Sequence, residues 1–309
     1  MEYRTEIDTV AIQIDCTNAV EQQGVLSGIV GFARGLKSSY VNYQDYPIGG
    51  VELGITKRKY TIYSTQVVIP TIDTGTTRMK HNGSYGINYY IAIKFAGLKK
   101  HDEVIDGASN DILLTVCAYL NTHGIVFKLT ELDICLDVEC VFNQMLAICT
   151  RKSSKTHYHA LDDIQVYDTT TYIENIDKPK RNKSVLRSYF YDKTHKENLT
   201  RQITRFEIKL QTMYFTQHGF SIESIVKVLE RYTVMYFESI EEKSKVIDAY
   251  NGYQYVRKRE RERLGLDKYR LLFDIDHISN FIKHIYTVHL NNTSLAGMFS
   301  VYPSTDTRG

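Results

Sequence analysis

Alternation of apolar and polar positions recurs along the first two thirds of the chain and predicts the strands of a sheet. The earliest strands are expected over residues 9–14, 59–70 and 87–95. Helical spacing of apolar residues predicts two helices in the same part of the chain. One runs from Asn18, a suitable N-cap, to about Leu36, and the other runs from Asp102 to about Thr122, before the stop signal His123-Gly124.

Three later strands each combine an apolar face with a polar face, and they are expected over residues 125–140, 185–193 and 204–211. In the first of them, Leu132, Ile134, Leu136 and Val138 alternate with Glu131, Asp133, Cys135, Asp137 and Glu139. Successive side chains of a strand point to opposite faces. A sheet that contains all three strands would therefore collect polar side chains on one face: Asp133, Asp137, Arg187, Tyr191 and Glu207.

These polar side chains supply the groups needed to cleave a phosphodiester. Carboxylate oxygens can hold a divalent cation that polarises a phosphate, and a tyrosine can attack phosphorus to form an ester. An arginine or lysine can balance the developing charge. The pattern places Asp133 and Asp137 near one another on a face that we expect to be open to solvent or a ligand. The alternative for this segment is an ordinary amphipathic strand whose solvent face is acidic.

The pattern changes after Gln211, where helical periods replace the strand patterns. Helices are expected over residues 222–239, 241–264 and 268–289. The sequence therefore predicts an α+β fold in which a mainly antiparallel sheet is backed by helices. We expect the sheet in residues 1–212 and a helical C-terminal region in residues 213–309.

The composition is that of an ordinary globular chain. Among 309 residues, 43% are hydrophobic and 24% are charged, which excludes a disordered, collagen-like or low-complexity protein. The formal net charge is only +2, so the chain has no overall basicity directed at nucleic acid or an anionic membrane. Either partner would have to be met by a local basic patch.

Cysteine usage and the apolar segments bear on the compartment. The 5 cysteines include no Cys-x-x-Cys pair, which argues against a zinc ribbon and favours a reducing cytoplasm. The start of the chain lacks a signal-peptide pattern, and the apolar stretches are too short to span a bilayer. We therefore expect a soluble, cytoplasmic protein with no membrane partner. The absence of a Gly-x-x-x-x-Gly-Lys phosphate loop argues against helicase activity.

Two basic segments can contact a nucleic-acid backbone. The first contains Lys178, Lys180, Arg181 and Lys183, and the second, inside an expected helix, contains Arg257, Lys258 and Arg259. The alternative for each segment is a solvated turn or a solvated helix face.

Three motifs follow one another along the chain: Leu132-Asp133-Ile134-Cys135-Leu136-Asp137, Arg187-Ser188-Tyr189-Phe190-Tyr191-Asp192-Lys193 and Arg205-Phe206-Glu207-Ile208-Lys209-Leu210. In order and spacing they resemble the Rep_trans family, the replication initiation factors of small rolling-circle plasmids and the related relaxases of conjugative elements and phages. The resemblance covers residues 88–210, whereas the first eighty residues match only loosely.

The resemblance implies roles for particular residues. Tyr191 falls at the position of the nicking nucleophile, and Lys193 is the lysine that accompanies it. Arg187 is a further catalytic candidate because of its place on the polar face, where it can balance the developing charge. Asp133, Glu207 and Asp137 match acidic residues that hold Mg²⁺ or Mn²⁺ in that family. Tyr172 and Tyr189 are alternative nucleophiles, but neither has a lysine two residues further on.

Two positions depart from the family pattern. Glu131 stands where an arginine is common, and Lys94 stands where an acidic residue is expected. The second departure either removes a metal ligand or shifts its supply to Asp137 or Glu139. A competing motif, His157-Tyr158-His159, is similar to the two-histidine metal motif of other nickases. Because its flanking residues have loop composition, we expect a surface or loop pair there.

The activity implied by the resemblance is nicking of one DNA strand at an origin by tyrosine transesterification. It yields a 5′-phosphotyrosine and a free 3′-hydroxyl that primes a host polymerase. The expected partners are origin DNA, a host helicase and polymerase and, as a homodimer, a second copy of the chain. Residues 213–309 are expected to contribute DNA specificity or dimerisation.

Two alternative functions remain open. One is a relaxase of a conjugative element, which uses the same chemistry. The other is a non-enzymatic DNA-binding regulator in which the same carboxylates form cross-strand ion pairs with Arg205 and Lys209.

Overall fold

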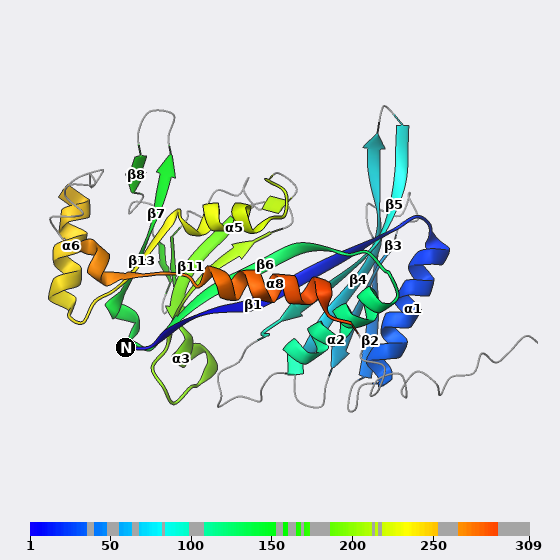
Figure 1. The fold of residues 1–309 in the computed structure, drawn as a ribbon, viewed down its shortest axis with the longest axis horizontal. Helices are drawn as coiled ribbons and strands as arrows, with labels where there is room; N and C mark the ends of the chain where they lie inside the picture. The colour runs from blue at the N-terminus through cyan, green and yellow to red at the C-terminus, as the bar shows by residue number, and fades with distance from the viewer. Residues whose placement is uncertain are drawn as a thin grey trace, which may run out of the picture. The chain divides into compact units, whose positions relative to one another are not determined.

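Antiparallel pairing of strands organises the chain, as the alternating patterns predict. The computed structural model describes residues 1–35, 40–47, 56–63, 68–81, 84–98, 108–152, 157–159, 165–167, 170–173, 186–211, 214–215, 218–252 and 265–289. Within these ranges the strand pairs of known register are antiparallel. Together with the helices labelled in Figure 1, this pairing confirms the expected α+β class.

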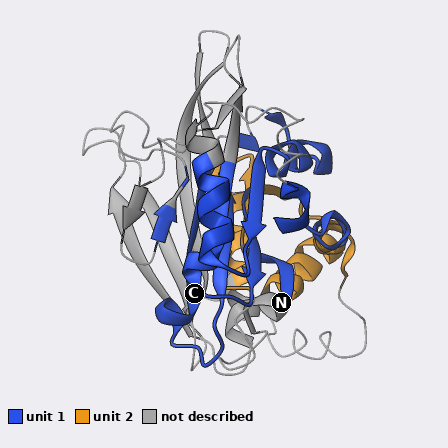
Figure 2. Cartoon of the chain, turned by 90° about the vertical axis from the view of Figure 1, so that its left-hand side faces the viewer, with its two compact units in different colours: residues 1–8, 131–280 blue, residues 9–130, 281–309 orange. Residues whose placement is uncertain are grey.

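The described chain forms two units, which Figure 2 distinguishes by colour. Unit 1 comprises residues 1–8 and 131–280, and unit 2 comprises residues 9–130 and 281–309. The boundaries fall inside strands β1 (Tyr3–Cys16) and β6 (Lys128–Val138) and inside helix α8 (Ile275–Thr287). This division differs from the expected ranges 1–212 and 213–309, because residues 213–280 belong to the same unit as the strands before them. Periodicity identifies an element but not what it packs against.

Unit 2 is built on antiparallel strands in the order β2-β3-β4-β5-β1. Residues 9–16 of β1 pair with residues 89–96 of β5, which sets the buried Ile12 opposite Ile93 and Ile14 opposite Ile91. The single strand expected over residues 59–70 is instead the end of one strand and the start of the next. The strands not yet delimited are β2 (Tyr40–Pro47), β3 (Thr56–Tyr63), β4 (Val68–His81) and β5 (Ser84–Ala96).

Helices α1 (Ala19–Gly35) and α2 (Ala108–Thr122) both lie against β5 in unit 2. Asn18 caps α1 as expected, since its side-chain oxygen accepts a hydrogen bond of 2.9 Å from the backbone N–H of Glu21. The chain leaves α2 through Gly124, whose φ of 65° lies in the left-handed region that glycine adopts readily. The described part of the helix expected over residues 102–122 begins at Ala108.

Unit 1 contains the three strands that the sequence predicts to share a sheet. Their order with two short strands is β6-β12-β11-β10-β9. The apolar faces of β6 and β12 are fully buried at Ile134, Leu136, Phe206 and Ile208. The elements concerned are β9 (Gln165–Tyr167), β10 (Thr170–Tyr172), β11 (Leu186–Asp192), β12 (Thr204–Leu210) and helix α3 (Lys193–Glu197), which directly follows β11.

A second sheet in unit 1 has the strand order β14-β13-β7-β8. Its strands are β7 (Met145–Lys152), β8 (His157–His159), β13 (Tyr232–Tyr236) and β14 (Arg270–Leu271). His157 and His159 lie in a strand rather than in the expected loop, because β8 pairs with residues 150–152 of β7, whereas the expected surface position stays a prediction. A strand of three residues between segments of loop composition is too short to be recognised by alternation.

The C-terminal part contains strands as well as helices. The helix expected over residues 222–239 ends at Leu229 as α5 (Ile222–Leu229), and β13 follows after a short turn. The helix expected over residues 241–264 is described only as α6 (Ile240–Gly252), and the one expected over residues 268–289 is α8. None of the helices in the described ranges is long and apolar enough to cross a membrane.

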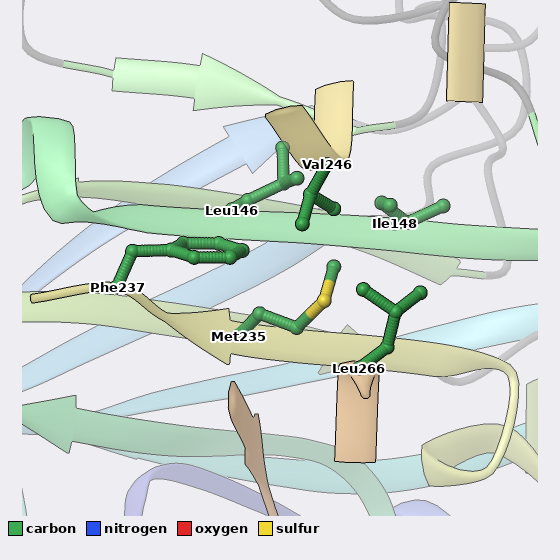
Figure 3. Close-up of a cluster of buried hydrophobic side chains, with 6 residues drawn as sticks. All are labelled: Leu146, Ile148, Met235, Phe237, Val246 and Leu266. Atoms are coloured by element: carbon green, nitrogen blue, oxygen red, sulfur yellow. The ribbon is translucent and has the colours of Figure 1, made fainter. Parts of the chain in front are cut away.

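A cluster of buried side chains explains why residues 232–236 form a strand. Pairing with β7 places Val234 and Met235 opposite Ala147 and Leu146. The cluster combines β7, β13, α6 and the short 3-10 helix Leu266–Tyr269, and Figure 3 shows its members: Leu146, Ile148, Met235, Phe237, Val246 and Leu266. Burial between partners that are distant in the sequence therefore outweighs the local helical spacing.

The contact of α1 with α2 yields a prediction about stability in unit 2. A Cβ atom at Gly28 would lie 2.1 Å from the hydroxyl oxygen of the buried Tyr119, whereas a Cβ atom at Gly24 on the same helix would meet nothing within 4 Å. We expect Gly28→Ala to lower the free energy of unfolding by about 1–3 kcal/mol through overpacking. Gly24→Ala, the matched control, should raise it by about 0.5–1 kcal/mol. Urea unfolding monitored by circular dichroism measures both; equal effects would contradict the close approach.

Candidate active site

The register of unit 1 aligns the predicted polar residues in three cross-strand rows. Lys209 lies opposite Asp133 and Arg187, Glu207 lies opposite Cys135 and Tyr189, and Arg205 lies opposite Asp137 and Tyr191. These nine residues form what we call the polar face: Asp133, Cys135, Asp137, Arg187, Tyr189, Tyr191, Arg205, Glu207 and Lys209. The structure therefore brings together the residues that the sequence predicts to share one face.

Six of the nine residues of the polar face are buried, which contradicts the expectation that it is open, and Arg187, Tyr189 and Lys209 are partly exposed. Asp133 is 0% exposed, Arg205 1% and Glu207 2%. The alternative of an ordinary strand with an acidic solvent face fails for the same reason. Burying a charge is costly unless it is paired and hydrogen-bonded. The pairing of these groups therefore decides both the stability of unit 1 and the chemistry open to it.

Arg205 and Asp137 form the most complete of these pairs. The guanidinium donates two parallel hydrogen bonds to the carboxylate, from Nε to Oδ1 at 2.5 Å and from Nη2 to Oδ2 at 2.8 Å. Its Nη1 atom donates to Asp8 at 2.5 Å, and Lys193 donates to Oδ2 of Asp137 at 3.2 Å. Asp137 thus has strong donors on both of its oxygens.

Lys209 joins two other carboxylates of the polar face. Its ammonium nitrogen lies 2.8 Å from Oδ2 of Asp133 and 2.9 Å from Oε1 of Glu207. The second oxygen of Asp133, Oδ1, is buried and has no hydrogen-bond partner among the described residues. Burial raises the pKa of Asp133 to about 6, although Lys209 opposes the shift by favouring the charged carboxylate.

Two tyrosines share the carboxylate of Glu207. The hydroxyl of Tyr189 donates to Oε1 at 2.6 Å, and the hydroxyl of Tyr191 donates to Oε2 over a longer distance of 3.4 Å. Burial is the main cause that raises the pKa of both phenols, and the charge of Glu207 adds to the effect. Both tyrosines are therefore protonated at neutral pH, with Glu207 placed to accept a proton from either.

Helix α3 carries two lysines near these groups. Lys193 is only 1% exposed, and its ammonium pairs with Asp137. Lys196 is exposed, and its ammonium lies 4.3 Å from the centroid of the Tyr191 ring. Asp192 caps the helix by accepting a hydrogen bond of 3.0 Å from the backbone N–H of His195. The cap fixes the turn that leads from Tyr191 into the lysine-bearing helix.

The candidate metal ligands divide into a pair that fits and a third residue that does not. Asp133 and Asp137 are four residues apart on one strand, so their Cα atoms are about 13 Å apart, and the expectation that they lie near one another is wrong. Asp137 is already held by Arg205 and Lys193. In the part of the chain that the structure describes, no three or more His, Cys, Asp or Glu residues gather to hold a metal.

Asp133 and Glu207 nevertheless approach a common point, because both contact the same ammonium. One or two carboxylates, completed by waters and a substrate phosphate, are a usual protein contribution to a Mg²⁺ site. The unpartnered oxygen of Asp133 adds a free acceptor to this pair. These two residues therefore fit a divalent cation.

The other residues singled out in the sequence belong to other segments or fall outside the described ranges. Lys94 is on β5 of unit 2, opposite Ala11, and Glu139 is exposed beyond the end of β6. The residues expected to bind nucleic acid fall outside the described part of the chain: Lys178, Lys180, Arg181, Lys183, Arg257, Lys258 and Arg259.

Sequence reasoning missed Asp8, which contacts Arg205, and the bond between Tyr189 and Glu207. The polar alternation of Arg4, Glu6 and Asp8 could have identified the first of these, because it extends the expected strand backwards. The bond between Tyr189 and Glu207 can be predicted only when the register of β11 against β12 is known.

The burial of Asp133 predicts a pH dependence of stability. Its folded-state pKa of about 6 lies above the ordinary value of 3.8, so the folded protein holds this proton more tightly than the unfolded chain. The associated stabilisation is present below about pH 4 and is lost as the pH rises through 6, which amounts to about 3 kcal/mol. Urea unfolding between pH 4 and 7 should show this decline in the wild type and a shallower one in Asp133→Asn. Parallel curves would contradict the shifted pKa.

The buried Arg205–Asp137 pair predicts a large effect of a single substitution. Arg205→Met removes the two guanidinium donors and leaves the buried Asp137 carboxylate with Lys193 alone, so we expect the free energy of unfolding to fall by about 3–5 kcal/mol. The matched control is Lys227→Met in the exposed pair with Glu223, which has a similar separation of 2.8 Å and should change stability little. Chemical denaturation compares the two; similar losses would show that burial does not distinguish these pairs.

No family model matches the chain, and no curated protein matches it significantly. Among solved structures, "Structure of Rolling Circle Replication Initiator Protein from Geobacillus stearothermophilus" is similar, with 10% sequence identity and a TM-score of 0.36. The alignment covers 93% of this chain and 98% of that chain. At this identity and TM-score, the similarity decides neither family membership nor function.

Proposed function

We propose that this protein nicks one DNA strand at an origin by tyrosine transesterification and so initiates rolling-circle replication. The observation that carries the proposal is the hydrogen bond that the Tyr191 phenol donates to Glu207. The Glu207 carboxylate contacts the same Lys209 ammonium as Asp133 does. The ordered motifs that resemble the Rep_trans family add the reaction type. Neither the fold nor the composition would suggest it alone.

In the proposed step, the Tyr191 oxygen attacks a phosphodiester and its proton passes to Oε2 of Glu207. A bond forms between the phenol oxygen and phosphorus, the bond from phosphorus to the 3′ oxygen breaks, and the departing oxygen takes a proton from solvent. The products are a 5′-phosphotyrosine and a free 3′-hydroxyl. Because the ester retains the energy of the phosphodiester, the reverse reaction reseals the strand.

The neighbouring side chains have supporting roles in this proposal. Asp133 and Glu207 would hold Mg²⁺ or Mn²⁺, which when bound polarises the scissile phosphate. Asp137 is assigned a different role from the one expected, because Arg205 and Lys193 occupy both of its oxygens. We propose that the ion pairs of Asp137 with Arg205 and Lys193 hold the neighbouring strands together. Arg187 remains a candidate for contact with the substrate phosphate.

Tyr191 is only 3% exposed, which sets a condition on the reaction. DNA can reach its hydroxyl only when side chains above the ring move. Lys196 is exposed and lies over that ring, so its movement onto a phosphate would both uncover the phenol and add a positive charge beside the leaving group.

The proposed partners follow from the reaction. The strand must be presented as single-stranded or cruciform DNA, a host polymerase extends the 3′-hydroxyl, and a separate helicase unwinds the duplex. We propose a homodimer by analogy with plasmid initiators. Relaxation of a conjugative element would use the same residues and differs only in the DNA that is recognised.

A non-enzymatic DNA-binding regulator is the second candidate function. The observation that favours it is that Arg205 pairs with Asp137 and Lys209 pairs with Asp133 across adjacent strands. Such pairs stabilise a sheet without any reaction. This candidate predicts binding of DNA without a covalent product.

The proposed nucleophile can be tested by trapping the covalent intermediate. Purified protein is mixed with labelled single-stranded oligonucleotides from its own genetic element, with and without Mn²⁺, and resolved on a denaturing gel. The wild type should form an adduct that requires the metal, and Tyr191→Phe should form none because it lacks the attacking oxygen. Binding of the same oligonucleotide should survive, since the ring is retained.

Tyr189→Phe is the matched control, because it removes the other phenol that donates to Glu207. It should retain the adduct at a reduced rate. An adduct in Tyr191→Phe that disappears in Tyr189→Phe would move the nucleophile to Tyr189. Tight DNA binding with no adduct from any strand would favour the regulator.

A further inference from the structure

Lys209 is more exposed to solvent than the two carboxylates that it joins. The side chains of Asp133 and Glu207 are 1% and 3% exposed, whereas the side chain of Lys209 is 28% exposed. A lysine has a long flexible stem, and part of this one reaches solvent. The two carboxylates are therefore held in the protein interior, and the cation between them has a route out.

The Lys209 ammonium does not fully neutralise Asp133 and Glu207 or satisfy all of their hydrogen-bond acceptors. Asp133 and Glu207 carry two negative charges when ionised, and Lys209 supplies one positive charge. Oδ1 of Asp133, buried within a residue that is 0% exposed, has no hydrogen-bond partner among the described residues. A buried acceptor without a donor costs free energy. A divalent cation with bound waters would neutralise both charges and provide donors for that oxygen.

The surroundings give the displaced ammonium a place to go. The Lys209 nitrogen lies 5.8 Å from the centroid of the Tyr189 ring, a distance at which a ring face attracts a cation. Tyr189 is partly exposed, so an ammonium held there would remain hydrated. A modest rotation of the stem would therefore separate Lys209 from the carboxylates.

We propose that Lys209 holds the divalent-cation position in the metal-free protein and leaves it when Mg²⁺ or Mn²⁺ binds between Asp133 and Glu207. The inference deepens the proposed function and rests on it for the identity of the ion. Lys209 stabilises the buried carboxylates until the metal arrives, and it weakens metal binding because the ion must displace it. Metal affinity is thus set by competition inside the protein.

The test measures Mn²⁺ binding in the absence of DNA. Lys209→Met keeps the stem and removes the charge, so Mn²⁺ should bind at least about tenfold more tightly than to the wild type, because no like charge has to be displaced. Electron paramagnetic resonance of free Mn²⁺ gives the affinity. The variant should also unfold at a lower temperature without metal and recover most of that loss when Mn²⁺ is added.

Lys196→Met is the matched control, because it removes the same charge from beside Tyr191 without vacating the position between the carboxylates. Its Mn²⁺ affinity should equal that of the wild type. Lys209→Gln is a second variant in case the methionine variant fails to fold, and it should also bind Mn²⁺ more tightly. Wild-type affinity in the Lys209 variants, or no Mn²⁺ binding in any of the proteins, would overturn the exchange.

These outcomes are separate from the test of nicking. Tighter Mn²⁺ binding in Lys209→Met together with no covalent adduct would retain the exchange and reject the nickase. A metal-dependent adduct together with unchanged affinity would retain the nickase and reject the exchange.

Discussion

The pairing of Arg205 with Asp137 is the interaction on which the rest of unit 1 depends. Both groups are buried within an antiparallel sheet, where an unpaired charge would cost several kcal/mol. The guanidinium links β12 to β6, and through Asp8 it also holds the start of β1. Such a pair contributes less net stability than an apolar contact of the same size, but it penalises every register that separates its members. It therefore fixes which residues of neighbouring strands face each other.

The register set by Arg205 also positions Glu207, two residues further along β12. With Arg205 opposite Asp137 and Tyr191, Glu207 necessarily lies opposite Tyr189 and diagonal to Tyr191. A single carboxylate thereby accepts a hydrogen bond from each of two phenols. In the proposed reaction, the geometry that would move a proton from a tyrosine is supplied by strands rather than by loops, which reduces the cost of organising it.

Much of this arrangement could be predicted from the sequence. Alternation alone assigns Asp133, Asp137 and Glu207 to one face, because the period of a strand is fixed by its geometry. It does not report whether that face is covered, and a buried polar face has the same pattern as an exposed one. Nor does it reveal that β13 interrupts a helical period, since the partner strand β7 precedes it by more than eighty residues and the burial of Met235 depends on that pairing.

The hydrogen bonding of the polar face differs between its two ends. At Asp137 both oxygens accept strong hydrogen bonds, so this end has the properties of a permanent cross-link. At the other end, Oδ1 of Asp133 has no hydrogen-bond partner among the described residues, and the hydrogen bond from Tyr191 to Glu207 is long at 3.4 Å. The Lys209 ammonium that joins Asp133 and Glu207 belongs to a partly exposed side chain. Oγ of Ser188 and Oε2 of Glu197 are also buried without a hydrogen-bond partner among the described residues, so an unpartnered atom does not by itself mark a site. In the proposed reaction, a substrate phosphate and a cation would complete the bonding around Asp133, Glu207 and Tyr191.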